Sequence, residues 1–213
     1  MRYMFEYRLK KIAKLAKGKI LEVGFSLLPN PFLKGDVTGV DIVLPEKKPR
    51  NYSRIIKGDI MKKLPFNGET FDTIIMSGVI EHLENPLKAL KECNRLLKKG
   101  GILLMETPNP YFILVIISDC LMNLKYYFED THVNLFPRRI ILKLLWHAGF
   151  DLHKILGCGF NLNNYTTIPL PQNLSQDLIY VAIKCKSKNR RYEKIINMRK
   201  SNYEEFKFSK FQT

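Results

Sequence analysis

The sequence predicts an α/β fold built on a doubly wound, mainly parallel sheet. Short apolar strand patterns alternate with helical or turn segments from residue 19 to 107, and acidic residues follow several of the strand patterns. This alternation is typical of βαβ units, whose parallel strands are covered by the connecting segments. The 213 residues are 46% hydrophobic, which is enough for one sizeable core without disulfide or metal staples.

A basic amphipathic helix is predicted over residues 3–17. Apolar residues recur there at spacings of four, three and four, which places them on one helical face, and most of the lysines fall off that face. Gly18 is expected to end the helix. The apolar residues are Phe5, Leu9, Ile12 and Ala16.

After the N-terminal helix, five strands and one further helix are predicted before residue 108. The helix begins at Pro86 and is expected to run to about Lys99, where Gly100 and Gly101 would cap it. A loop over residues 24–35 follows the first strand. The strands are expected over residues 19–23, 36–41, 54–57, 71–77 and 102–106.

The C-terminal half continues with helices and ends in two strands. Residues 110–127 are apolar and helix-like, and a further helix is predicted from Pro137 to Ala148. Strands are predicted over residues 150–156 and 178–184, joined by a loop rich in Asn and Pro. Two late strands joined in this way are expected to pair as a terminal antiparallel hairpin.

The charge divides the chain into three parts. The net charge is +15. Residues 1–19 carry +6 of it, residues 184–213 carry +7, and the middle is nearly neutral at +2. We therefore predict a basic N-terminal helix over 1–18, a core domain over 19–185 and a basic C-terminal tail over 186–213. The basic termini indicate RNA or an anionic membrane surface as a partner, or else a lysine-rich composition without a partner.

The cysteine pattern and the N-terminus indicate a reducing compartment. The four cysteines lie far apart, no CxxC pair exists, and no apolar segment follows the basic N-terminus as in a secretory signal. The longest apolar run is too short to span a membrane. We expect a cytoplasmic protein with free thiols at Cys93, Cys120, Cys158 and Cys185.

Acidic side chains stand at the ends of three predicted strands. Glu22 lies near the end of the first, Asp41 ends the second and Asp59 follows the third. Ligands of open parallel sheets bind outside the carboxyl ends of the strands, so these acids are expected to converge on one cleft. Carboxylates there suit a ligand with several hydrogen-bond donors, such as ribose hydroxyls and amines. No phosphate-binding GxxxxGK[ST] loop is present.

The same stretches carry a family resemblance. The chain resembles the class I S-adenosylmethionine-dependent methyltransferases over about residues 19–185. The resemblance implies a seven-stranded Rossmann-like sheet whose last strand is antiparallel, and S-adenosylmethionine as cofactor. The matching segments are KILEVG (19–24), GVDI (39–42), KGDIMKKLPF (57–66), the stretch 71–110 with Val79-Ile-Glu-His82, and the stretch 129–150 with Asp130-Thr-His132.

The resemblance also implies a set of cofactor-binding residues. Asp41 corresponds to the acid that accepts from the ribose hydroxyls, and Asp59 to the acid near the adenine amine. Glu22 and Gly24 would lie beside the methionine part of the cofactor. The full set implied is Glu22, Gly24, Asp41, Ile42, Asp59, Ile60, Ser77, Gly78, Val79 and His82.

The first motif departs from the family pattern of an acid followed by three alternating glycines. Here it reads Glu22-Val-Gly24-Phe-Ser26-Leu-Leu28, so only the first glycine remains. Glycine allows close backbone approach and positive φ at little cost. The loop is therefore expected to be reshaped, with cofactor binding either retained in altered geometry or lost.

Function follows from the resemblance, with three alternatives. The leading one is methyl transfer to a small-molecule or lipid-linked acceptor, aided by alignment and, for a protic nucleophile, by a base. His132 is the candidate base, with a structural role in its turn as the alternative. The second is an RNA methyltransferase that uses the basic termini. The third is a degenerate, non-catalytic binding domain. No His/Cys/Asp cluster has metal-ligand spacing, so no metal is expected.

Overall fold

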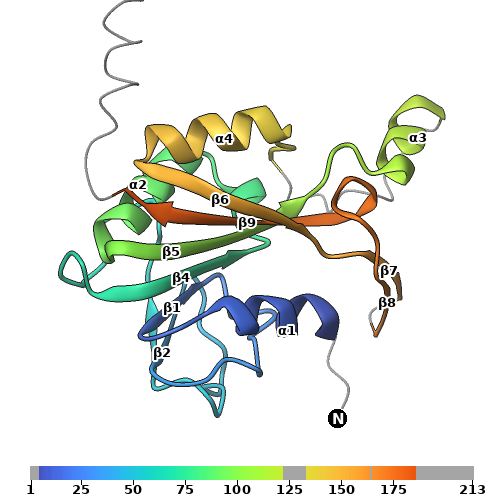
Figure 1. Ribbon diagram of the computed structural model, residues 1–213. Helices are drawn as coiled ribbons and strands as arrows, with labels where there is room; N and C mark the ends of the chain where they lie inside the picture. The colour runs from blue at the N-terminus through green and yellow to red at the C-terminus, as the bar shows by residue number, and fades with distance from the viewer. Residues whose placement is uncertain (1–4, 122–132, 164, 186–213) are drawn as a thin grey trace, which may run out of the picture.

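The computed structural model describes residues 5–121, 133–163 and 165–185, and its centre is a seven-stranded sheet (Figure 1). The strand order is β3-β2-β1-β4-β5-β9-β6. Strands β1 to β5 are parallel, and β9 is antiparallel to both of its neighbours. The predicted sheet and the pairing of the two late strands are confirmed. The strands are β1 (Ile20–Val23), β2 (Val37–Asp41), β3 (Arg54–Lys57), β4 (Phe71–Ser77), β5 (Leu97–Pro108), β6 (Phe150–Gly157) and β9 (Asp177–Lys184).

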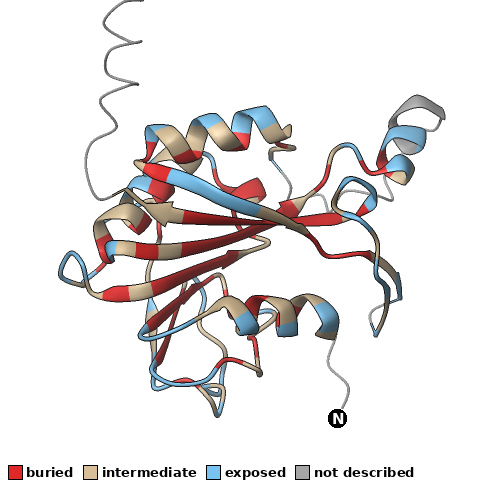
Figure 2. Ribbon diagram, viewed as in Figure 1, coloured by how far each residue is buried: buried red, intermediate tan, exposed pale blue. Residues whose placement is uncertain are grey.

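Helices cover the two faces of the sheet and bury its apolar side chains. On one face lie α2 (Pro86–Leu96) and α4 (Arg138–His147), with Leu90 and Ile141 in the core cluster (Figure 1). On the other face lies α1 (Glu6–Leu15), which contributes Ile12 to a second cluster. The central strands are almost continuously buried (Figure 2), as expected for parallel strands covered on both sides.

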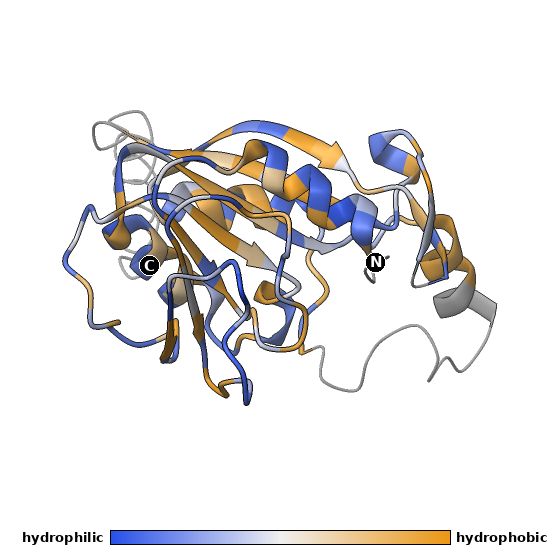
Figure 3. Ribbon diagram, turned by 90° about the horizontal axis from the view of Figure 1, so that it is seen from below, coloured by the Kyte–Doolittle hydropathy of each residue, from blue (hydrophilic) through white to orange (hydrophobic). Residues whose placement is uncertain are grey.

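The N-terminal helix is amphipathic as predicted. Leu9 and Ile12 are 2% and 1% exposed, and α1 carries both apolar and hydrophilic residues (Figure 3). The helix ends at Leu15, two residues before the predicted end at residue 17. Gly18 follows it with φ +66°, and a Cβ there would lie 2.5 Å from the Asp72 carboxylate. The chain can make this turn beside β4 only because residue 18 is a glycine.

The end of α2 differs from the prediction of a helix to Lys99. The helix ends at Leu96, and Leu97 is already extended and paired with Phe71 of β4. Gly100 and Gly101 lie in an irregularity of β5 and do not cap the helix. A Cβ at Gly101 would lie 2.9 Å from the Lys98 carbonyl oxygen, so the glycine is required by the tight backbone of this bulge.

The segment predicted as a loop over residues 157–173 contains a two-stranded hairpin. Its strands are β7 (Phe160–Asn163) and β8 (Thr166–Ile168), and η2 (Gln172–Leu174) follows. The Phe160 ring packs against Phe112, just before α3 (Ile113–Leu121), with ring centroids 5.5 Å apart. The remainder of the predicted 110–127 helix and the tail 186–213 lie outside the described residues.

Candidate active site

The three predicted acids lie on adjacent strands at one edge of the sheet. Glu22 of β1 is in register with Gly39 of β2, and Asp41 is in register with Lys57 of β3. The Gly58 N–H donates to the Asp41 carbonyl at 2.8 Å, which sets Asp59 beside the end of β2. The carboxyl ends of β1, β2 and β3 therefore lie side by side, as the strand-end argument requires.

Glu22 is enclosed beneath this edge and does not face an open cleft. It is 4% exposed, and its Oε2 accepts a hydrogen bond from the Tyr52 hydroxyl. The Asn30 N–H donates to the same hydroxyl at 3.1 Å. Burial raises the pKa of Glu22 to about 8, against the opposing effect of the Asn30 backbone N–H. In the structure its side chain bonds to Tyr52, in the segment before β3, and the expectation that Glu22 lines a cofactor cleft stays a prediction.

The loop after β1 is held in place by the buried ring of Phe25. Phe25 is 1% exposed, and its ring lies 5.2 Å from the Tyr52 ring, centroid to centroid. The ring also packs on Gly39, where a Cβ would be 2.7 Å from it. Leu27 at the loop surface is 97% exposed. Burial of Phe25 thus fixes this loop against the sheet face, and the reshaping that the motif suggests stays a prediction.

Asp41 lies where the loop after β1 meets the end of β2. Its Oδ2 accepts the Ser26 N–H at 2.9 Å, and its Oδ1 accepts the Val43 N–H at 3.3 Å. The Ser26 hydroxyl donates to the Val43 carbonyl at 2.5 Å, which closes the loop onto the strand end. A carboxylate has about four acceptor positions, so each oxygen retains one for a ligand hydroxyl. Ile42 beside it is 64% exposed and offers an apolar surface.

Asp59 and Ile60 differ in what they present at the end of β3. Asp59 is half-buried, and its Oδ1 accepts the Met61 N–H at 2.8 Å. Lys62 is 3.8 Å from its Oδ2. Ile60, in contrast, is 4% exposed and belongs to the core cluster that contains Val40. The side chain of Ile60 is therefore used in packing, and its place beside the cofactor stays a prediction.

The ends of β1 and β4 meet at Gly24 and Val79. Gly24 has φ +74°, and a Cβ on it would lie 2.4 Å from Val79 Cγ2. Gly78 also has positive φ, at +63°. The residues that the resemblance groups at this point are thus brought together, with Val79 only 9% exposed. Ser77 points toward β5, where its hydroxyl donates to Glu106 Oε2 at 2.7 Å.

Two charged residues at this edge escaped the sequence analysis. Arg8 of α1 lies 3.1 Å from Glu106 at the end of β5, with side chains 14% and 2% exposed. The Arg8 Nε is buried and has no hydrogen-bond partner among the described residues. Glu106 follows the same strand-end pattern as the other acids, so that signal was available. Arg8 had no such signal, because only the packing of α1 brings it to β5.

Further acids surround this pair. Asp177, at the start of β9, is 7% exposed, and burial together with the nearby Glu106 raises its pKa to about 7, although Arg8 opposes the shift. Glu81 of η1 (Ile80–His82) is 2% exposed. Burial, with smaller contributions from Glu106 and Asp177, raises the pKa of Glu81 to about 8. The carboxyl ends of β4 and β5 and the start of β9 therefore enclose three acids near one guanidinium.

Two histidines are site candidates, and one of them lies in the described part of the chain. His82 is half-buried in η1. His132 lies outside the described residues, but the next two residues contact η1: the N–H groups of Val133 and Asn134 both donate to the Glu81 carbonyl at 3.0 Å. The segment after His132 is thus held against η1.

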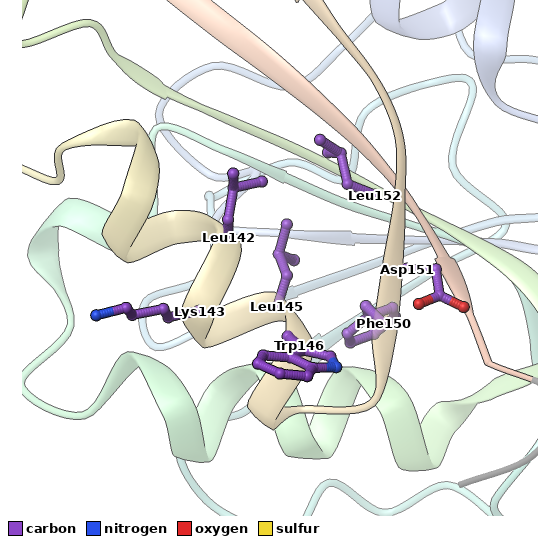
Figure 4. A pocket seen from close by; sticks show the side chains of 7 residues that line it. All are labelled: Leu142, Lys143, Leu145, Trp146, Phe150, Asp151 and Leu152. Atoms are coloured by element: carbon purple, nitrogen blue, oxygen red, sulfur yellow. The ribbon is translucent and has the colours of Figure 1, made fainter. Parts of the chain in front are cut away.

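A groove on the surface lies away from these strand ends. It runs between α4 and the edge strand β6, as Figure 4 shows, and none of the strand-end acids lines it. The groove is lined by Leu142, Lys143, Leu145, Trp146, Phe150, Asp151 and Leu152.

Among the described residues, no group of three or more His, Cys, Asp or Glu side chains is arranged to hold a metal ion. In the same part of the chain, no helix has the length and apolar character needed to cross a membrane.

Comparisons with known proteins agree with this arrangement. The family described as "Methyltransferase domain" matches residues 3–155. A ubiquinone biosynthesis O-methyltransferase of Chromobacterium violaceum is 24% identical over 168 residues, 70% of this chain and 71% of the relative. A demethylmenaquinone methyltransferase of Staphylococcus haemolyticus is 38% identical over 84 residues, 36% of this chain and 35% of that protein.

A solved structure shares the fold. It is described as a SAM-dependent methyltransferase, "possible histamine N-methyltransferase", from Thermotoga maritima. The two chains superpose with a TM-score of 0.62 at 22% identity, over 84% of this chain and 87% of the other. At that identity the likeness establishes the fold.

Proposed function

Since the chain belongs to the methyltransferase-domain family and is an S-adenosylmethionine-dependent methyltransferase, we propose that it transfers the methyl group to a small-molecule or lipid-linked acceptor at the carboxyl ends of β4 and β5. One observation carries this proposal: Asp41 and the Arg8–Glu106 pair lie at the same edge of the sheet. Asp41 has free acceptor positions, and the Nε of Arg8 is an unused donor.

The residues present fit S-adenosylmethionine, which supplies an activated methyl group when it is bound. In this proposal Asp41 accepts from the ribose hydroxyls and Ile42 covers one face of the adenine. Asp59 lies near the adenine amine. Gly24, Gly78 and Val79 would line the methionine part. The donors of Arg8 and the carboxylate of Glu106 suit the carboxylate and ammonium at the end of that part.

The acceptor is proposed from the relatives and from the surroundings of the site. The printed names of the two relatives connect one with ubiquinone biosynthesis and the other with demethylmenaquinone. Several apolar side chains near the base of α3 and on the β7–β8 hairpin are exposed, among them Tyr111, Ile113, Leu162 and Ile168. An apolar or lipid-linked small molecule is compatible with such a surface. We retain His132 as a candidate base and the cytoplasm as the location.

Calorimetric titration tests the cofactor assignment. S-adenosylhomocysteine should bind the wild-type protein, and Asp41→Asn should weaken its binding by about 1–3 kcal/mol, or roughly 5- to 150-fold, through lost hydrogen bonds to the ribose. Glu46→Gln is the matched control, because Glu46 is an exposed acid of the following loop. Absence of binding to the wild-type protein would refute methyl transfer and favour a non-catalytic domain. Unchanged binding in a folded Asp41 variant would show that the ribose is held elsewhere.

A further inference from the structure

Glu81 has a buried carboxylate oxygen that no group in the described part of the chain satisfies. Its Oε2 is buried and has no hydrogen-bond partner. The Thr107 side chain and the residue's own backbone lower the pKa of this carboxyl group, against the larger effect of burial. A buried carboxylate oxygen without a donor is costly, and native proteins rarely retain one without a functional reason. The missing donor is the first indication of a ligand at this position.

The surroundings of Glu81 determine which charge that ligand carries. Glu106 and Thr107 of β5 and Asp177 of β9 are the groups that act on its carboxylate, and His82 is its neighbour on η1. The only guanidinium described at this cluster is that of Arg8, which is bonded to Glu106. Three carboxyl groups near one arginine leave an excess of negative charge when they are ionised. Such a cluster favours a cation that donates hydrogen bonds.

The position of Glu81 assigns that cation to the acceptor. Glu81 lies four residues beyond the end of β4, past Gly78 and Val79, which line the proposed cofactor site. Its carbonyl also holds residues 133 and 134, which lead into α4. The Arg8–Glu106–Ser77 hydrogen bonds lie on the β5 side of the same edge. Glu81 adjoins the groups proposed for the cofactor, because its Oε1 lies 4.0 Å from a Cβ built on Gly78 and Glu106 acts on its carboxylate. A group bound at its unsatisfied oxygen would therefore lie next to the cofactor, as a methyl acceptor must.

We propose that the methyl acceptor is an amine and that Glu81 is a catalytic residue that binds its ammonium group and removes one proton. This inference rests on the proposed methyltransferase function and names its substrate class. Glu81 takes an N–H proton, and the freed nitrogen lone pair forms the new N–CH3 bond. The S–CH3 bond of the donor breaks, and its electron pair stays on sulfur, which becomes an uncharged thioether. The proton on Glu81 then passes to solvent on product release.

Pairs of isosteric probes test this assignment by binding. Ethylamine and ethanol, hexylamine and hexanol, and 2-phenylethylamine and 2-phenylethanol are titrated into the protein saturated with S-adenosylhomocysteine. In at least one pair the amine should bind 10-fold or more tightly than the alcohol. Glu81→Gln should remove most of that difference, whereas Glu84→Gln, at an exposed acid of the same loop, should leave it intact. No preference for the amine in any pair, or a preference that survives Glu81→Gln, would overturn the proposal.

The pH dependence of the wild-type protein provides a second measurement that does not require the variant to fold. The ammonium is bound by the ionised carboxylate, so amine affinity should rise between pH 6 and pH 8.5 while alcohol affinity stays flat. A flat amine profile would contradict a role for a carboxylate in this range. Binding of S-adenosylhomocysteine is measured first: its absence refutes the proposed function, whereas its presence without an amine preference refutes only the role of Glu81. Radiolabelled methyl transfer to the preferred amine, reduced at least 100-fold by Glu81→Gln, completes the test.

Discussion

Replacing Gly24 with alanine tests how closely the ends of β1 and β4 approach. Two costs add at this position. The φ of +74° is a left-handed conformation that costs an L-residue about 1–2 kcal/mol. The new Cβ would also lie 2.4 Å from Val79 Cγ2, and overpacking of this kind costs about 1–3 kcal/mol because valine has little rotamer freedom. We expect the free energy of unfolding to fall by about 2–5 kcal/mol.

Gly35 provides the matched control for the backbone cost. Its φ is +93°, but a Cβ there meets nothing closer than the Gly18 carbonyl oxygen at 3.7 Å. Gly35→Ala should therefore cost only about 1–2 kcal/mol. Urea unfolding followed by far-UV circular dichroism measures both variants. If Gly24→Ala were no more destabilising than Gly35→Ala, the contact between the two strand ends would not be as tight as we infer. Adding Val79→Ala to Gly24→Ala should recover part of the loss.

Three further outcomes follow from the charged groups. Glu22 has an ordinary pKa near 4.5 and a folded-state pKa of about 8, so the wild-type free energy of unfolding should fall as pH rises from 4.5 to 8. In urea unfolding, Glu22→Gln should flatten this pH dependence. An unchanged slope in the variant would mean that other groups cause the pH dependence. Arg8→Ala should lower the free energy of unfolding by about 3–5 kcal/mol by leaving Glu106 buried without its partner; a loss below 1 kcal/mol would mean that Glu106 is otherwise satisfied. Removal of residues 186–213 should leave the melting temperature and cofactor affinity unchanged while weakening binding to RNA or anionic vesicles; a lower melting temperature would mean that the tail packs on the domain.

The sequence by itself determined which strands and helices follow one another along the chain, and which acids stand at the strand ends. Strand patterns and their alternation with helices are local properties of the chain, so β1 to β5, α2 and α4 were predictable from periodicity and from Pro and Gly positions. The end of α2 was not, because the Gly100–Gly101 pair is equally suited to a helix cap and to a strand bulge. Pairing of Leu97 with Phe71 decided between them.

Only the tertiary structure decided what each acid contacts. Glu22, Asp41 and Asp59 have the same place in the sequence pattern, yet Tyr52 encloses Glu22 while Asp41 keeps acceptor positions for a ligand. Arg8 reaches Glu106 across 98 residues of sequence, and no local pattern encodes a contact at that separation. Burial and hydrogen-bond partners arise from packing between distant segments, and they determine which carboxyl groups serve the fold and which are left for ligands.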